Sequence, residues 1–272
     1  MLRHSRPPLG LAALLLSTSA LAAPALATPA LATPALAAPE RRMPETQMEL
    51  GLSYEPMTNG YADWQSRYFF GALDFGRRDT LYAQIRETDR FAVRDQEVMV
   101  GRYYPLGERV TGMAEASFSP SAVVLPRYSA QGLLLVDVGN GWSLGGALAR
   151  TEYSSALVHR GTLTVERYWQ AFRFALASSL SQVADGSLPL GHTAQVSFYP
   201  DDRNSVTLTA GTGEEVEALG PGQVLRTNVR SLSLSGRYWL DSRWGLTPLI
   251  AWTEQGSYYH RMEMRLGLRY RL

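Results

Sequence analysis

The sequence predicts an all-β protein, a transmembrane up-and-down antiparallel β-barrel of about fourteen strands. Three observations predict this fold. After Thr46, apolar and polar residues alternate with a period of two along most of the chain. Short turns alternate with mostly longer connectors, and aromatic residues gather beside the short turns. No segment after Thr46 keeps a helical period over three turns or forms an apolar run of about eighteen residues.

The N-terminus predicts export. Arg3 and Arg6 precede an apolar stretch from Leu9 to Ala23, and "ALA" at positions 20–22 is a small-residue cleavage site. We therefore expect a signal peptide over residues 1–22. The repeats "PALAT", "PALAT" and "PALAA" follow, and they predict a Pro/Ala-rich spacer or extended signal region over 23–45, which offers further cleavage sites. The barrel domain is then expected over 46–272.

The composition excludes several classes of function. The chain has 26 basic and 25 acidic residues, so no net field attracts it to nucleic acid. Every basic residue is arginine, and there is no cysteine, which removes disulfides, thiolate catalysis, cysteine metal sites and a lipid-bearing cysteine. We predict no catalytic residues, no cofactor and no metal.

The last segment has the clearest alternation. From His260 to Leu272 the even positions are mainly apolar, and the odd positions are arginine, glutamate or glycine. Such a segment is a strand with one apolar and one charged face. The strands predicted in this way cover residues 46–55, 63–74, 79–88, 94–104, 108–118, 129–138, 142–151, 158–168, 171–182, 191–199, 204–213, 225–239, 244–254 and 259–272. Twelve or sixteen strands remain as alternatives, because a bulge can merge or split a pair.

The lengths of the connectors distinguish the two ends of the predicted barrel. Tight turns are predicted around 76–79, 105–107, 139–141, 169–170, 200–203 and 240–243, and "GNG" at 139–141 is typical of a two-residue hairpin. Longer connectors are predicted around 56–62, 119–128, 182–190 and 214–224. All tight turns would then lie at one end, as in outer-membrane barrels.

Charge burial fixes which face meets lipid. An arginine at the bilayer middle costs about 2–4 kcal/mol when it faces lipid, and a slip of one residue exchanges the two faces. The apolar face must therefore point outward and the polar face must line the lumen. The predicted lumen-facing residues are Glu49, Gln84, Arg86, Arg261, Glu263, Arg265 and Arg269.

Aromatic residues beside the short turns predict an interfacial girdle, because these rings have an apolar body and often a polar tip. Several occur as pairs, namely Tyr103 and Tyr104, Tyr168 and Trp169, Phe198 and Tyr199, and Tyr238 and Trp239. The predicted girdle residues are Tyr104, Trp142, Trp169, Phe198, Tyr238 and Trp244. Part of the opposite ring is expected from Trp64, Tyr68, Tyr128 and Trp252.

The final residues "RLGLRYRL" resemble the C-terminal assembly signal of bacterial outer-membrane barrels. The matching positions are Arg265, Gly267, Tyr270 and Leu272, and the last of these departs from the usual Phe. The resemblance implies recognition by the barrel-assembly machinery during biogenesis and a location in the outer membrane of a Gram-negative bacterium.

The stretch "LGLSYEPMTNGYADWQSRYF", together with this terminus, resembles the YaiO family of outer-membrane β-barrel proteins. The shared features are a first strand that ends in tyrosine and a loop with Asn59, Gly60, Asp63 and Trp64. The likeness covers Thr46 to Leu272. It implies fold and location, and it assigns no functional residues.

Three functions are compatible with this reading. The first is a passive pore for small hydrophilic solutes or another envelope component. An alternative is a scaffold or receptor that binds a surface polysaccharide or its export machinery, with Tyr61 and Trp64 as candidate sugar-stacking residues. A lipid- or lipopolysaccharide-modifying enzyme is the weakest reading, because His159, His192 and His260 lack a serine at the expected sequence spacing. The acidic residues Glu214, Glu215 and Glu217 are read as solvated loop charges. The expected partners are outer-membrane lipid and lipopolysaccharide.

Overall fold

The computed structural model describes residues 45–76, 78–90, 93–154, 156–183, 186–220 and 223–272, and it describes no side chains between 215 and 226. The predicted signal peptide (1–22) and the spacer up to residue 44 lie outside the described residues. Among the residues described, no helix is long and apolar enough to cross a membrane.

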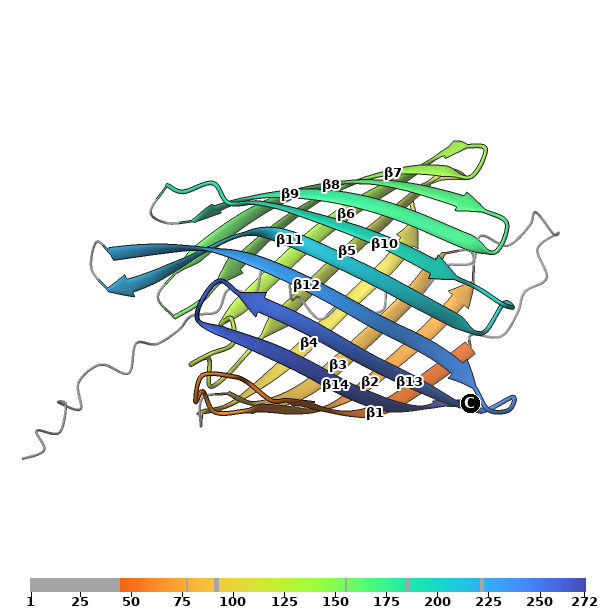
Figure 1. The fold of residues 1–272 in the computed structure, drawn as a ribbon. Helices are drawn as coiled ribbons and strands as arrows, with labels where there is room; N and C mark the ends of the chain where they lie inside the picture. Colours follow the sequence, from red (N-terminus) through yellow and green to blue (C-terminus); the bar gives the residue numbers. More distant parts are fainter. Residues whose placement is uncertain (1–44, 77, 91–92, 155, 184–185, 221–222) are drawn as a thin grey trace, which may run out of the picture.

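Fourteen antiparallel strands form one closed barrel, in which each strand pairs with the next and β1 pairs with β14 (Figure 1). The predicted count of fourteen is therefore confirmed. The strands are β1 (Glu45–Glu55), β2 (Trp64–Gly76), β3 (Asp79–Arg90), β4 (Val93–Pro105), β5 (Val110–Phe118), β6 (Tyr128–Gly139), β7 (Trp142–Glu152), β8 (Leu157–Trp169), β9 (Phe172–Val183), β10 (Leu190–Phe198), β11 (Ser205–Gly220), β12 (Gln223–Trp239), β13 (Trp244–Gln255) and β14 (Tyr259–Arg271).

One predicted connector is wrong. Residues 214–224 were expected as a loop, but β11 and β12 continue through most of them and form a hairpin that projects beyond the neighbouring strands (Figure 1). Glu214 pairs with Asn228 in this ladder and therefore lies in a strand. The acidic sequence suggested a loop because acidic residues are depleted in strands, but this preference depends strongly on context.

The tight turns have the residues that their backbones need. Asn140 and Gly141 connect β6 to β7 with φ values of 53° and 75°, so both lie in the left-handed region that a two-residue hairpin requires. In the turn between β12 and β13, the Asp241 carboxylate accepts hydrogen bonds from the backbone N–H groups of Arg243 and Trp244, both at 2.7 Å. These bonds favour the ionised carboxylate and hold the pKa of Asp241 below its usual range.

The outer face of the barrel is apolar. Large aliphatic side chains on it are strongly exposed, for example Leu148 at 76%, Leu163 at 73% and Leu52 at 66%. Soluble monomers rarely expose contiguous apolar patches larger than a few hundred Å², so this surface belongs in lipid. Closure of the sheet also leaves no unpaired strand edge in the hydrocarbon.

The apolar band ends at an aromatic girdle on one side and at polar residues on the other. At the tight-turn end, five of the six predicted girdle residues are exposed on the outer face, and the sixth, Tyr104, is half-buried. Toward the opposite end, charged and polar side chains appear on the same face, eight residues from Trp142 at Arg150 and ten from Trp169 at His159. Eight to ten residues along strands tilted by about 40° rise about 20–25 Å, which matches the height of the apolar band of outer-membrane barrels.

The aromatic pairs beside the turns divide between the two faces, which corrects the prediction that they form one ring. Tyr103 and Trp239 are buried inside, at 6% and 8% exposure, because consecutive residues of a strand point to opposite faces. The predicted opposite ring is also partly wrong. Tyr128 and Trp252 are exposed on the outer face, but Trp64 is fully buried and Tyr68 points into the lumen.

Candidate functional site

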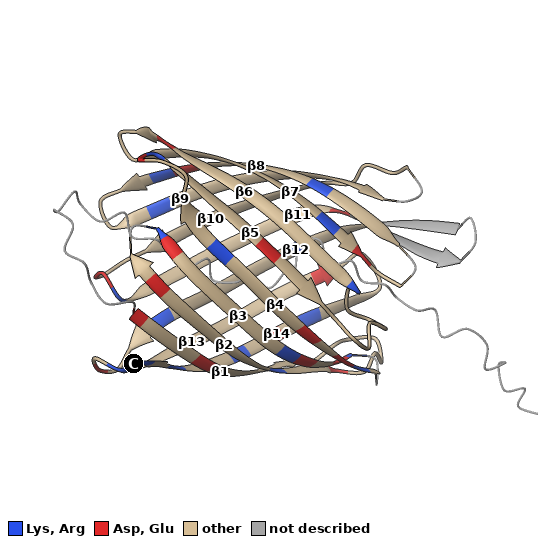
Figure 2. Ribbon diagram, turned by 180° about the vertical axis from the view of Figure 1, so that it is seen from behind, with Lys and Arg blue, Asp and Glu red and all other residues tan. Residues whose placement is uncertain are grey.

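The lumen is the candidate functional site, and its wall is asymmetric. The strands from β14 through β1 to β5 place bulky charged and aromatic side chains on the inner face. The inner face from β7 to β13 is mostly serine, threonine, alanine and glycine at mid-height, with Gln195 and Leu249 as larger exceptions. Examples of this small-residue wall are Ala149, Thr164, Ala177, Ser179, Thr193, Thr209, Ser231, Ser233 and Ala251. Both signs of charge occur along the strands (Figure 2).

All seven predicted lumen residues lie on the inward-facing positions of their strands. Glu49, Gln84 and Arg261 are buried, at 5%, 8% and 7% exposure. The other four, Arg86, Glu263, Arg265 and Arg269, are half-buried. All seven residues come from β1, β3 and β14, on the charged side of the lumen.

Glu49 is the centre of a network that crosses the closing seam. Its carboxylate accepts hydrogen bonds from Arg269 Nε at 2.7 Å, from the Tyr68 hydroxyl at 2.5 Å and from the Thr247 hydroxyl at 2.7 Å. One side chain of β1 thus contacts β2, β13 and β14. Space for it comes from Gly267 on β14, where a Cβ atom would lie 2.4 Å from a Glu49 carboxylate oxygen. Gly51 leaves corresponding room for the ring of Tyr68.

Several other inward charges are also paired. Arg86 lies 2.9 Å from Glu97, and Arg261 lies 3.1 Å from Glu55. Near the tight-turn end, Arg173 forms an ion pair with Glu166. Pairing of these charges avoids the cost of burying an isolated ion.

An apolar cluster lies on the same side of the lumen, toward the tight turns. Its buried members are Tyr82, Met99, Tyr103 and Met113, and Phe70 packs against them. Tyr82 also donates a hydrogen bond of 2.8 Å to Glu115, so the cluster has a polar border. The charged side of the wall therefore includes an aromatic and methionine surface.

Trp64 was predicted for the outer girdle or for an exposed sugar-binding loop, and both predictions are wrong. The residue is 0% exposed, and the centre of its ring lies 4.3 Å from the guanidinium of Arg90 and 4.6 Å from that of Arg261. Trp64 pairs with Glu55 at the start of β2, which places it on the inner face. Both contacts have the distance of a cation–π interaction, so they favour the buried position of Trp64.

The segment between β5 and β6 is held by one buried carboxylate. Strand β5 ends at Phe118, opposite Val98, so the upper part of β4 has no β5 partner. Asp95 is 0% exposed there, and it accepts hydrogen bonds from the N–H groups of Val123 at 2.9 Å, Val124 at 2.6 Å and Leu125 at 2.8 Å. These bonds fold residues 119–127 against β4.

Replacing Asp95 by alanine is expected to release residues 119–127, because three N–H groups lose a charged acceptor, and hydrogen bonds to charged groups are worth about 1.5–3 kcal/mol each. The measurement is limited proteolysis of the folded barrel, with new cleavage after Arg127 by trypsin. Asp89→Ala is the control, since Asp89 is a half-buried residue of a neighbouring strand. Equal resistance of Asp95→Ala and wild type would contradict this role.

A contact between two strands also brings together a serine and a histidine that are far apart in the sequence. The Ser178 hydroxyl lies 3.0 Å from His192 Nδ1 on the outer face, where the two residues are register partners on β9 and β10. The prediction from the sequence considered only the spacing along the chain, so it did not detect this contact between strands. Within the described part of the chain, no group of three or more histidine or acidic side chains is placed to hold a metal ion.

The residues of the predicted assembly signal lie along β14. Tyr270 packs against Trp244 with ring centroids 4.7 Å apart, and the N–H of Leu272 donates to the carbonyl of Thr46 at 3.0 Å. Arg265 and Gly267 face inward. Recognition of this terminus by assembly machinery stays a prediction.

Known structures are similar to this chain in fold. A monoaromatic hydrocarbon channel, CymD, matches with a TM-score of 0.54 at 8% identity, over 85% of this chain and 88% of the other. A bacterial polysaccharide outer membrane secretin matches with a TM-score of 0.51 at 12% identity, over 86% of this chain and 100% of the other. At such identities the likeness concerns the fold alone, which is that of an outer-membrane barrel.

A search of curated proteins finds no match. The family model described as the YaiO membrane beta barrel domain matches residues 45–218, from the first strand into β11, and this span is more than half of the chain. The resemblance to this family is thereby confirmed; the matched residues include the first loop but not the C-terminal segment. The chain belongs to the YaiO family of membrane β-barrels.

Proposed function

We propose that this protein is a passive pore for small hydrophilic solutes in the outer membrane of a Gram-negative bacterium. The observation that carries the proposal is the small-residue wall from β7 to β13, opposite the charged wall. Fourteen strands spaced about 4.8 Å apart and tilted by about 40° give a backbone radius of about 14 Å. Side chains from one side alone do not fill a lumen of this width, so space for water remains along the small residues.

The pairing of the inward charges bears on selectivity. Ion pairs such as Arg86 with Glu97 and Arg269 with Glu49 place both signs on the same wall. A solute therefore meets no large field of a single sign, and we expect weak discrimination between small anions and cations. The fold relatives named above include a channel, but they are too distant to assign a solute.

The test is single-channel conductance of the refolded protein in planar bilayers. We expect discrete conductance steps for the wild type. Ser233→Trp, which adds a large ring to the small-residue wall, is expected to lower the conductance. Leu234→Trp is the matched control, because the neighbouring side chain is exposed on the outer face, and it should leave conductance unchanged. Well-folded wild-type protein that gives no steps would contradict the proposal.

A second candidate function is hydrolysis of a membrane lipid, and the Ser178 and His192 pair is the observation that favours it. A serine beside a histidine supplies a nucleophile and a general base. A hydrolase also needs an oxyanion donor and a group that orients the histidine. Release of fatty acid from vesicles by the wild type, lost in Ser178→Ala, would favour this function over the pore, and no release from either protein would exclude it.

A further inference from the structure

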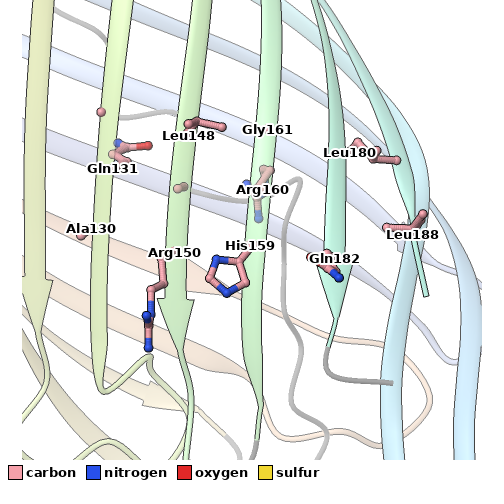
Figure 3. A pocket seen from close by; sticks show the side chains of 12 residues that line it. Ala130, Gln131, Leu148, Arg150, His159, Arg160, Gly161, Leu180, Gln182 and Leu188 are labelled. Atoms are coloured by element: carbon pink, nitrogen blue, oxygen red, sulfur yellow. The ribbon is translucent and has the colours of Figure 1, made fainter. Parts of the chain in front are cut away.

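A cavity of about 520 Å³ opens on the outer face of the barrel, over β6 to β9 (Figure 3). Its apolar lining includes Leu148, Leu180 and Leu188, the last from the segment between β9 and β10. On the outer face of a membrane barrel such a space is filled by lipid rather than by water. An acyl chain is the apolar group available there.

The cavity exists because two outward positions carry no side chain. Gly132 and Gly161 line it from β6 and β8. A Cβ atom at Gly161 would come no closer than 3.8 Å to Leu148, and one at Gly132 no closer than 3.9 Å to the Met113 carbonyl, so neither glycine is required by crowding. The neighbouring leucines then form the sides of a depression with glycine at its floor.

Polar groups border the cavity on the side away from the tight turns. Arg150, His159 and Gln182 are register partners on β7, β8 and β9, in the row directly beyond Leu148, Gly161 and Leu180. The three side chains stand on neighbouring strands around the cavity in Figure 3. All three are exposed, and they lie at the upper border of the apolar band.

The charge at this border is positive on balance. Arg150 lies 3.7 Å from Glu152, and an exposed pair of this kind adds little and leaves the guanidinium accessible. Arg127 lies next to the same glutamate, since its N–H donates to the Glu152 carbonyl at 2.7 Å. This border therefore has two arginines and a histidine on β7, β8 and the segment before β6, and one glutamate, Glu152.

We propose that this depression is a binding site for an anionic lipid. The phosphate lies against Arg150 and His159, Gln182 donates to a headgroup oxygen, and one acyl chain occupies the space above Gly161. Charge-assisted hydrogen bonds from a guanidinium suit a phosphate, and the glycine floor admits a chain that a larger residue would exclude. The site is independent of any flow through the lumen.

The experiment uses the full-length mature barrel in nanodiscs of phosphatidylcholine that contain a small fraction of either phosphatidylglycerol with the same acyl chains or lipid A. Lipid retained after mild detergent extraction is counted by native mass spectrometry. We expect about tenfold enrichment of anionic lipid over phosphatidylcholine. Enrichment of only one of the two anionic lipids also supports the site and identifies the source of the phosphate.

Two variants separate the headgroup from the chain. Arg150→Gln combined with His159→Gln should reduce the enrichment about tenfold, to that of bulk lipid. Gly161→Leu should abolish retention of a lipid, whereas Gly71→Leu should not, because Gly71 is an outward glycine of β2 with equally open space. The heat-modified mobility of each variant reports folding. Enrichment that is absent in the wild type, or equal in Gly161→Leu and wild type, would overturn the proposal.

Discussion

Replacement of Glu49 by alanine is expected to lower the free energy of unfolding by about 3–5 kcal/mol, the cost of breaking a buried ion pair by removing one partner. Glu49 is 5% exposed, and its loss leaves the Arg269 guanidinium and the hydroxyls of Tyr68 and Thr247 without their shared acceptor. The measurement is reversible urea unfolding of the barrel in lipid vesicles, followed by tryptophan fluorescence.

The controls separate charge from shape. Glu49→Gln retains an acceptor of the same size, so we expect it to lose less stability than Glu49→Ala. Arg269→Met in the Glu49→Ala background removes the orphaned guanidinium and should recover part of the loss, because a buried pair is often replaced by apolar residues at little cost. If Glu49→Ala unfolds at the same urea concentration as wild type, the seam network is not what closes the barrel.

A substitution at Gly267 bears on the same network. The sequence predicts that this glycine is part of a C-terminal assembly signal, and the structure adds a local reason for a glycine there. A Cβ atom there would lie 2.3 Å from the Thr247 hydroxyl and 2.4 Å from a Glu49 carboxylate oxygen, closer than real contacts permit. Glycine at this position on β14 leaves the space across which the Glu49 side chain reaches Thr247 on β13.

Strand number and strand faces were predictable from the sequence because each rests on a local pattern. The alternation in β14 fixes which side chains meet lipid, and the energy of exposing arginine to hydrocarbon leaves one orientation. The tight turns were predictable for the same reason, since Asn140 and Gly141 fit a specific backbone. Each of these features depends on residues that are close together in the sequence.

The details of the lumen depend on register, which no local pattern contains. Trp64 faces inward because it opens β2 opposite Glu55, and its aromatic character alone favoured an interfacial position. Ser178 and His192 are separated by fourteen residues, and they meet because β9 and β10 pair in one particular register. The division of the lumen into a bulky and a small side likewise emerges only after β1 is placed beside β14.

A substitution in the middle of β12 tests whether the apolar face of the strands contacts lipid. Leu234 is 48% exposed on the outer face and lies four residues from Tyr238 in the girdle and four from the outward Arg230. Leu234→Arg is therefore expected to cost about 2–4 kcal/mol, the penalty for an arginine that faces lipid near the bilayer middle. The same unfolding measurement in vesicles gives the value.

Ser233→Arg is the comparison, because it places the same side chain one residue away on the inner face. That arginine joins a wet, polar wall beside Thr209 and Ala251, its register partners, so we expect a loss within about 1 kcal/mol. The two variants share the added arginine, the net charge and the strand, and they differ in the residue replaced and in the face that carries the charge. A larger loss for Ser233→Arg than for Leu234→Arg would mean that the apolar face does not contact lipid, and the open lumen would have to be abandoned with it.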